Sequence, residues 1–166
     1  MEMRVGEAMA GRGENRVHIN LLLGSREGPV GHAFATALAS PRPGHVPFLV
    51  TLRPNVPVRP ATLFVNKAEV RGDAHARLTW GPAQAGVAAG VVDAVTEGVI
   101  PGGQVDELVL IAAVWVDWAA ADVDEVYGNN RDATLGALRT GSCHQPTLDE
   151  VIAARSTPWN PFFRPG

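Results

Sequence analysis

The chain has 166 residues, of which 46% are hydrophobic and 19% are charged, and its formal net charge is -3. This length suits one domain with a sizeable hydrophobic core, so we expect residues 1–166 to fold as a single domain. The small negative charge gives no reason to expect a nucleic-acid partner or a membrane surface. The single cysteine, Cys143, excludes an internal disulfide and a cysteine-rich metal site.

The N-terminal sequence MEMRVGEAMAGRGE carries charges throughout and lacks the apolar stretch of a secretory signal. The most apolar run, LVLIAAVWV, has the length of a strand and not that of a membrane-spanning helix. We therefore expect a cytoplasmic protein without a membrane segment.

Apolar periodicity, glycine and proline divide the chain into strands and helices. Strands are predicted at residues 4–9, 17–23, 46–52, 61–70 and 107–118. Helices are predicted at residues 29–40 and 81–98, after residue 130, and at residues 147–154. Proline near the start of the first two helices, and proline or glycine at their ends, sets their limits. This order of elements predicts an α/β two-layer sandwich with a mixed sheet.

Four polar residues stand out within these elements. His18 and Asn20 are two residues apart in a strand, so both point to the same face. Lys67 is the only lysine among fourteen lysine and arginine residues, and lysine, unlike arginine, can release its proton near neutral pH. Gln84 lies in the first turn of a predicted helix, among apolar neighbours.

Each of the four also has an ordinary structural explanation. A strand histidine is more often a satisfied structural residue than a catalyst, and Asn20 can bond the backbone at a strand end. Gln84 can be a surface residue, and one lysine can survive by chance in an arginine-rich composition. Residue chemistry alone leaves these alternatives open.

The common catalytic motifs are absent from the chain. There is no complete dinucleotide-binding glycine pattern, no phosphate loop and no nucleophile elbow. The five histidines are scattered, and no pair has the spacing of zinc ligands. We therefore expect no metal and no redox cofactor.

Several long segments, taken together and in order, resemble the formaldehyde-activating enzyme family. They are VGEAMAG and VHINLLLG, where the family typically reads VGEALVG and AHIDLIIG, followed by FATALAS, LRPNVPVRPATLFVNK, WGPAQAGVAAGVVDAVTEGVIP and VWVDWAAAD. The tail STPWNPFF is similar to the family's ATHPF ending. The resemblance covers nearly the whole chain without large gaps.

The resemblance implies a ribosomal protein S5 domain 2-like fold, assembled as a homopentamer with the site between neighbouring subunits. The implied reaction condenses formaldehyde with tetrahydromethanopterin, a reduced pterin that acts as co-substrate, and no tightly bound cofactor is expected. His18 falls on the position of the family's catalytic histidine, which would act as a general acid. The expected substrate-binding positions are Asn20, Leu49, Lys67, Glu69 and Gln84.

Two of these positions differ from the family. Asn20 replaces an aspartate, and an amide has one acceptor oxygen and no charge that would favour a protonated His18. Glu69 replaces a threonine and is expected on the same strand face as Lys67. There it could restore the missing charge, pair with Lys67 or close part of the pocket.

Three functions therefore remain open. The first is the family reaction with tetrahydromethanopterin. The second is a divergent paralogue that condenses formaldehyde or another aldehyde with a different amine, such as a folate-like carrier. The third is a non-catalytic protein that binds formaldehyde or a pterin. Retention of His18 and Lys67 argues against the third, while Asn20 and Glu69 argue against assuming the first.

Overall fold

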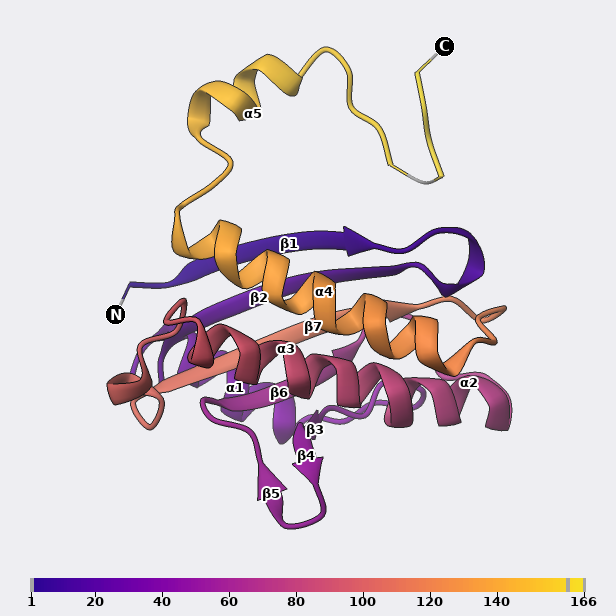
Figure 1. Ribbon diagram of the computed structural model, residues 1–166, viewed down its shortest axis with the longest axis horizontal. Coiled ribbons are helices and arrows are strands. Elements are labelled where there is room, and N and C mark those ends of the chain that lie inside the picture. The colour runs from indigo at the N-terminus through magenta and orange to yellow at the C-terminus, as the bar shows by residue number, and fades with distance from the viewer. Residues whose placement is uncertain (1, 161, 166) are drawn as a thin grey trace.

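A five-stranded mixed sheet forms the centre of the computed structural model, which describes residues 2–160 and 162–165 (Figure 1). The strand order is β1-β2-β7-β6-β3. The strands are β1 (Arg4–Ala10), β2 (Val17–Ser25), β3 (Phe48–Leu49), β6 (Ala61–Asn66) and β7 (Leu108–Val116). Neighbouring strands are antiparallel except β6 and β7, which are parallel. The predicted mixed sheet is confirmed.

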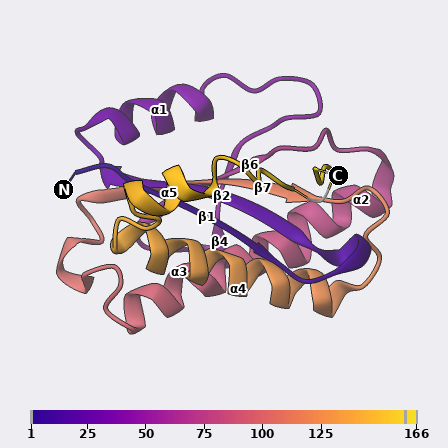
Figure 2. The ribbon, with the colours of Figure 1, turned by 90° about the horizontal axis from the view of Figure 1, so that it is seen from above.

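Helices cover the two faces of the sheet unequally (Figure 2). The long helices α3 (Gln84–Thr96) and α4 (Val123–Ser142) lie side by side on one face, and α1 (Pro29–Leu38) lies on the opposite face. The short helix α2 (Gly72–Leu78) continues through a π-helical turn, η2 (Thr79–Ala83), into α3. Two 3-10 turns lie in connections, η1 (Gly13–Asn15) between β1 and β2 and η3 (Gly102–Gln104) between α3 and β7. The architecture agrees with the predicted two-layer sandwich.

Strand β2 shows how the sequence divides the sheet into a core face and an open face. Val17, Ile19, Leu21 and Leu23 are at most 2% exposed and belong to the hydrophobic core beneath α3 and α4. Burying a side chain of this size stabilises a fold by about 1.5–3 kcal/mol. The even-numbered residues between them point to the other face, because side chains alternate along a strand. That face is covered by α1 near Gly24, where an added Cβ would contact the Val30 side chain.

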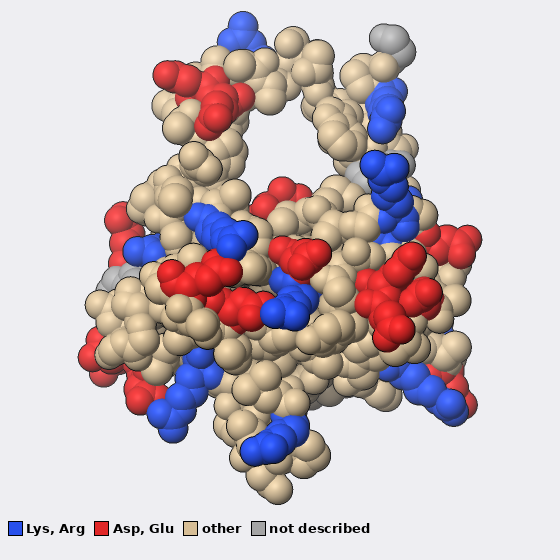
Figure 3. Space-filling model, viewed as in Figure 1, with Lys and Arg blue, Asp and Glu red and all other residues tan. Residues whose placement is uncertain are grey.

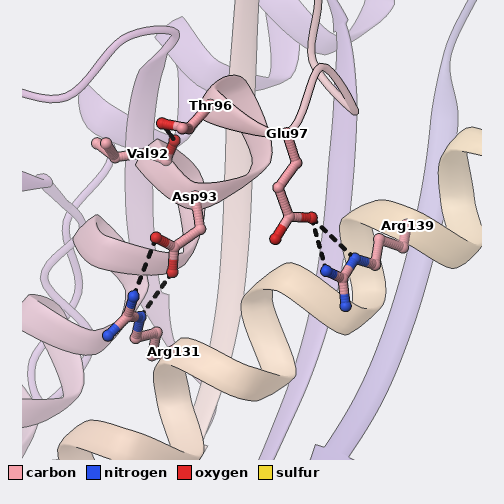
Figure 4. A network of polar contacts seen from close by, with 6 residues as sticks. All are labelled: Val92, Asp93, Thr96, Glu97, Arg131 and Arg139. Atoms are coloured by element: carbon pink, nitrogen blue, oxygen red, sulfur yellow. Dashed lines mark hydrogen bonds and ion pairs between the residues drawn. The ribbon is translucent and has the colours of Figure 1, made fainter.

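Helices α3 and α4 pack closely because small residues form their interface. A Cβ added to Gly86 would overlap the backbone carbonyl oxygen of Tyr127 on α4. The outer side of this helix pair carries two ion pairs, Arg131 with Asp93 and Arg139 with Glu97, each with a shortest N–O distance of 2.6 Å (Figure 4). Acidic and basic side chains are interspersed across this side of the molecule (Figure 3).

Several sequence predictions differ from the structure. The strand predicted at residues 46–52 is divided at Val50, because β4 (Thr51–Arg53) leaves the sheet to form a separate hairpin with β5 (Val56–Pro57). Helix α2 was not predicted, and α4 begins at Val123 and not after residue 130. The sequence around the start of α4 is polar, but the Asp122 side chain caps it by accepting hydrogen bonds from the backbone N–H groups of Asp124 and Glu125.

Residues 143–160 and 162–165 form a C-terminal arm that stands away from the body (Figure 1). The arm contains α5 (Leu148–Ala154), close to the prediction, and a capping box between Thr147 and Glu150 begins this helix. Every described residue of the arm is exposed, including Leu148, which is 73% exposed, and Phe162, which is 76% exposed. The space-filling view shows an opening between the arm and the body (Figure 3).

Candidate active site

A histidine–carboxylate pair occupies the open face of the sheet at the end remote from α1. His18 on β2 and Glu7 on β1 reach this face from an antiparallel hairpin in which Glu7 is in register with Asn20. The His18 Nε2 atom lies 2.7 Å from Glu7 Oε1. The pair is accessible, since the His18 side chain is 33% exposed and the Glu7 side chain is 57% exposed. A ligand can therefore reach both groups.

Lys67 follows directly after β6 and completes the group. Its Nζ atom lies 2.9 Å from His18 Nδ1 and donates a hydrogen bond of 2.8 Å to Asn20 Oδ1. Strand β7 lies between β6 and β2 and places Ala113 in register with Asn20 on one side and Val65 on the other. A small side chain at that position leaves room for the lysine to reach across the intervening strand. The structure thus brings together three of the predicted site residues.

The protonation of Lys67 is set by two opposing effects. Burial lowers the pKa of the Lys67 ammonium to about 8, while the Glu7 carboxylate acts in the raising direction. When Lys67 is protonated it donates to His18 Nδ1, so a neutral His18 carries its proton on Nε2 and donates to Glu7. Glu7, His18, Lys67 and Asn20 thereby form one continuous hydrogen-bonded series. Along such a series a proton can pass between Lys67, His18 and Glu7, while Asn20 only accepts a hydrogen bond.

Aromatic side chains lie beside this series. Trp115 on β7 is in register with His18, and its ring centroid lies 5.9 Å from that of Phe162 of the arm, nearly perpendicular to it. The Arg16 guanidinium lies 5.4 Å from the Trp115 ring centroid and 5.5 Å from that of Phe162. The arm therefore returns to the body next to the histidine, and its aromatic residue borders the site.

Two further predicted residues lie in a separate pocket. Leu49 and Gln84 line an open pocket of about 390 Å³ together with Val46, Phe48, Thr51 and Trp80. The Gln84 Oε1 atom accepts a hydrogen bond of 2.6 Å from the Thr51 backbone N–H, which fixes the amide at the start of α3. His18 and Lys67 are not among the residues that line this pocket. Within one chain, the predicted site is thus divided into two parts.

Glu69 does not have the surroundings expected from the sequence. Strand β6 ends at Asn66, whose side-chain Nδ2 donates to the backbone oxygens of Gly44 and Ala68 and holds the chain in a turn. Glu69 therefore lies beyond the strand and not on a shared strand face with Lys67. Among the described residues, its carboxylate pairs with Arg71 at 3.4 Å, and its backbone oxygen accepts from Trp118 Nε1. The expected pairing of Glu69 with Lys67 is absent from these contacts.

Sequence reasoning missed Glu7 and Trp115. The carboxylate that was sought at position 20 or 69 is supplied by Glu7, from the strand paired with β2. A signal was present, because Glu7 is a charged residue within a predicted strand and within the VGEAMAG segment. The register of the hairpin, which brings Glu7 to the imidazole, could not be read from the sequence alone.

The described residues contain no group of three or more His, Cys, Asp or Glu side chains arranged to hold a metal ion. No helix in the described ranges combines the length and apolar character needed to cross a membrane.

Comparison with known proteins gives consistent matches over this chain. Residues 5–163 match the family described as formaldehyde-activating enzyme (Fae). A 5,6,7,8-tetrahydromethanopterin hydro-lyase from Methanosarcina barkeri is 41% identical over 162 residues, which are 98% of this chain and 91% of that protein.

Two relatives are named bifunctional enzyme Fae/Hps. The protein from Methanococcoides burtonii is 42% identical over 150 residues, and that from Archaeoglobus fulgidus is 40% identical over 162 residues. The matches cover 90% and 98% of this chain but only 38% and 41% of those relatives. Because the family match and the M. barkeri relative both span nearly the whole chain, the chain belongs to the formaldehyde-activating enzyme family.

Proposed function

We propose that this protein condenses formaldehyde with tetrahydromethanopterin to give 5,10-methylenetetrahydromethanopterin and water, as part of cytoplasmic one-carbon metabolism. The observation that carries the proposal is the hydrogen-bonded series of Glu7, His18 and Lys67 on an accessible face of a chain of this family. The name of the M. barkeri relative, a tetrahydromethanopterin hydro-lyase, supports the choice of pterin.

His18 is proposed as the general acid of this reaction. A pterin nitrogen attacks formaldehyde to give a carbinolamine, and the loss of its hydroxyl group needs a proton because hydroxide is a poor leaving group. Histidine can donate that proton near neutral pH, and a positioned acid–base group of this kind accelerates a reaction by about 10²–10⁴-fold. The resulting iminium then closes on the second pterin nitrogen to form the methylene bridge.

The proposal includes a homopentamer in which neighbouring subunits share each site. The separation of His18 and Lys67 from the pocket of Leu49 and Gln84 supports this arrangement, because one chain alone holds the predicted residues in two places. The uncovered part of the sheet face also supports it, since Met9, in register with His18, is 42% exposed and Val5, further along the same face, is 55% exposed. Exposed apolar side chains next to a site are typical of protein interfaces.

Asn20 favours a second candidate, the condensation of formaldehyde with a different amine. Its Oδ1 atom already accepts a hydrogen bond from Lys67, so its amide group presents N–H donors to a ligand. An aspartate at this position would present only acceptors, as the guanidine-like edge of a pterin requires. A carrier with a carbonyl oxygen at the corresponding place would suit Asn20 better.

The test is to follow methylene-bridge formation by absorbance after mixing formaldehyde with tetrahydromethanopterin or, separately, with tetrahydrofolate. Acceleration above the spontaneous rate with methanopterin is expected. Acceleration with tetrahydrofolate alone would favour a folate-like carrier, chosen by parts of the molecule other than the pterin edge that the two carriers share. A flat result with both carriers would contradict condensation with these two carriers and leave another amine or a binding role.

His18→Ala provides the control for the role of the histidine. Its rate is expected to fall by about 10²–10⁴-fold while its circular dichroism spectrum and oligomeric size stay those of the parent. Equal rates in the two proteins would remove His18 as the catalyst.

A further inference from the structure

Lys67 has the surroundings of an activated nucleophile. Its Nζ atom lies 2.9 Å from one nitrogen of His18, whose other nitrogen lies 2.7 Å from the Glu7 carboxylate. Enzymes use the same order of nucleophile, base and orienting group to remove a proton from an attacking atom. Transfer of one proton from Lys67 to His18 leaves a neutral amine and places the new imidazolium against a carboxylate.

The environment of Lys67 also favours the neutral amine. A pKa of about 8 leaves roughly a tenth of Lys67 unprotonated at pH 7, whereas an ordinary lysine is unprotonated in fewer than about one molecule in a thousand. Neutral amines attack aldehydes, and this one lies on the face that formaldehyde would enter.

We propose that Lys67 captures formaldehyde covalently, as a lysine-bound methylene iminium, before the amine carrier receives the carbon. The proposal rests on the proposed function for its substrate, formaldehyde. It extends that function, because Lys67 becomes a covalent carrier of the carbon and not only a binding residue.

The capture step balances without any oxidant or reductant. Lys67 transfers a proton to His18 Nδ1, and the neutral Nζ atom attacks the carbonyl carbon, so a C–N bond forms while the C–O double bond becomes single. The nitrogen passes one proton to the oxygen, which gives a carbinolamine. The nitrogen lone pair then expels the hydroxyl group, which takes the proton of the His18 imidazolium and leaves as water.

Transfer to the carrier regenerates the lysine. A carrier amine attacks the iminium carbon and forms a second C–N bond, which gives an aminal. The Lys67 nitrogen then accepts a proton from the attacking amine and departs as a neutral amine, so the iminium passes to the carrier. The second carrier nitrogen attacks this iminium to close the bridge, and the proton it loses returns Lys67 to the ammonium form. The sum of the steps is formaldehyde plus diamine giving the methylene bridge plus water.

The test is to trap the iminium with borohydride, which reduces it to a stable N-methyl amine. Lys67 is the only lysine of the parent chain, so a variant with one added lysine offers two candidate positions, which fragmentation of the peptides in the mass spectrometer distinguishes. Arg59→Lys supplies a reference amine within the same molecule, since the Arg59 side chain is 70% exposed and lies in an ion pair with Asp106, outside the site. The trapping is performed on this variant with limiting formaldehyde and short exposure.

We expect Lys67 to be methylated at least about tenfold faster than the reference amine, and at least as fast as the accelerated condensation measured in parallel. His18→Ala in the same background should slow labelling of Lys67 by at least about tenfold while labelling of the reference amine is unchanged. Addition of tetrahydromethanopterin before borohydride should prevent methylation of Lys67 and leave methylation of the reference amine unchanged.

The outcomes separate this proposal from the proposed function. Covalent capture would be overturned if condensation is accelerated while Lys67 is trapped more slowly than turnover, or no faster than the reference amine. That outcome would leave the proposed function intact. Fast trapping that depends on His18, without acceleration by either carrier, would overturn the proposed condensation and leave formaldehyde capture by Lys67 standing.

Discussion

Lys67 is held in the fold as an ammonium group that has lost part of its hydration. Its pKa is lowered to about 8 in the folded chain from a reference value of 10.5, with burial as the main cause. Between these two values the unfolded chain binds more protons than the folded one, so the free energy of unfolding rises with pH in that interval. Below a pH of about 8 both states are protonated and the cost of holding the ammonium stays constant.

Lys67→Met should therefore remove a pH dependence of stability. We expect the free energy of unfolding of the parent to rise between about pH 8 and pH 10.5, and that of Lys67→Met to lack this component. Urea unfolding across this range measures the difference between the two proteins. Arg59→Lys is the control, because the exposed lysine that it adds titrates alike in the folded and the unfolded chain. Parallel curves of the free energy of unfolding against pH for the parent and Lys67→Met would contradict the lowered pKa.

Glu7→Gln should lower the pKa of Lys67 below about 8, because the Glu7 carboxylate acts to raise it. Glutamine keeps an oxygen that can accept from His18 Nε2, so the imidazole retains its orientation. The pH at which reductive methylation of Lys67 is half-maximal should move downward. Glu7→Ala, which also loses the oxygen that accepts from His18, should in addition reduce the rate of methylation of Lys67 at high pH. An upward shift of the half-maximal pH in Glu7→Gln would contradict a raising effect of Glu7 on the pKa of Lys67.

Single residues of the candidate site were predictable where their chemistry is unusual. A histidine on a strand and one lysine among many arginines could be recognised, and the structure places their side chains in contact. Glu7 was missed because its proximity to His18 depends on hairpin register. The environment of Glu69 was mispredicted because the hydrogen bonds of Asn66 end the strand, and those bonds depend on a loop distant in sequence.

At the scale of elements, the contact between α3 and α4 depends on the absence of side chains. Gly86→Ala would force its Cβ into the Tyr127 carbonyl, so the helices must separate or shift. Overpacking of this kind destabilises proteins by about 1–3 kcal/mol, and we expect the free energy of unfolding to fall by that order.

Gly128→Ala is the matched control on the facing helix. No atom lies within 4 Å of a Cβ added there, and alanine is favoured over glycine in a helix by about 0.5–1 kcal/mol. This variant should be as stable as the parent or more stable in denaturant unfolding. Equal effects of the two substitutions would mean that helix propensity, and not the α3–α4 contact, determines the result.

Strongly periodic elements were predictable, and elements that depend on context were not. Strands β2 and β7 and helix α3 carry enough apolar residues to be recognised locally. The division of residues 46–52 at Val50 depends on the hairpin partner β5, which is not among the predicted strands. Helix α4 presents a polar surface over much of its first turns, so its start was placed too late although Asp122 is a recognisable cap residue.

At the scale of the whole molecule, the division of the predicted site within one chain makes a shared site testable. His18→Ala and Gln84→Ala, expressed separately, should each lose activity. When they are co-expressed in equal amounts, random assembly of a cyclic oligomer makes about a quarter of the shared sites complete, so about a quarter of the parent rate should return. A site contained within one chain would show no such recovery.

The control for this experiment combines two substitutions in the same part of the site, the part that a single chain holds together. Co-expression of His18→Ala with Lys67→Ala should restore nothing, because every site then lacks one of the two residues that already contact each other within one chain. Sedimentation of each mixture confirms that assembly itself is unchanged. Recovery in this control would indicate exchange of whole domains and would contradict the proposed sharing.

The fold class followed from the order of elements, but the arrangement of the molecule in space did not. Nothing in the sequence indicated that α1 would cover only one end of its sheet face, or that the arm would return to Trp115. Both features depend on contacts between segments far apart in the chain. They also determine which part of the sheet remains open to a ligand or to another subunit.

The arginine ion pairs between α3 and α4 have a consequence for the durability of a protein that works in formaldehyde. Formaldehyde stiffens and cross-links proteins through neutral amines, and a surface held together by lysine would slowly lose its charges to the reagent. Arg131 and Arg139 carry guanidinium groups, which offer no such amine. The helix pair can thus keep its charges in contact in the presence of the reagent.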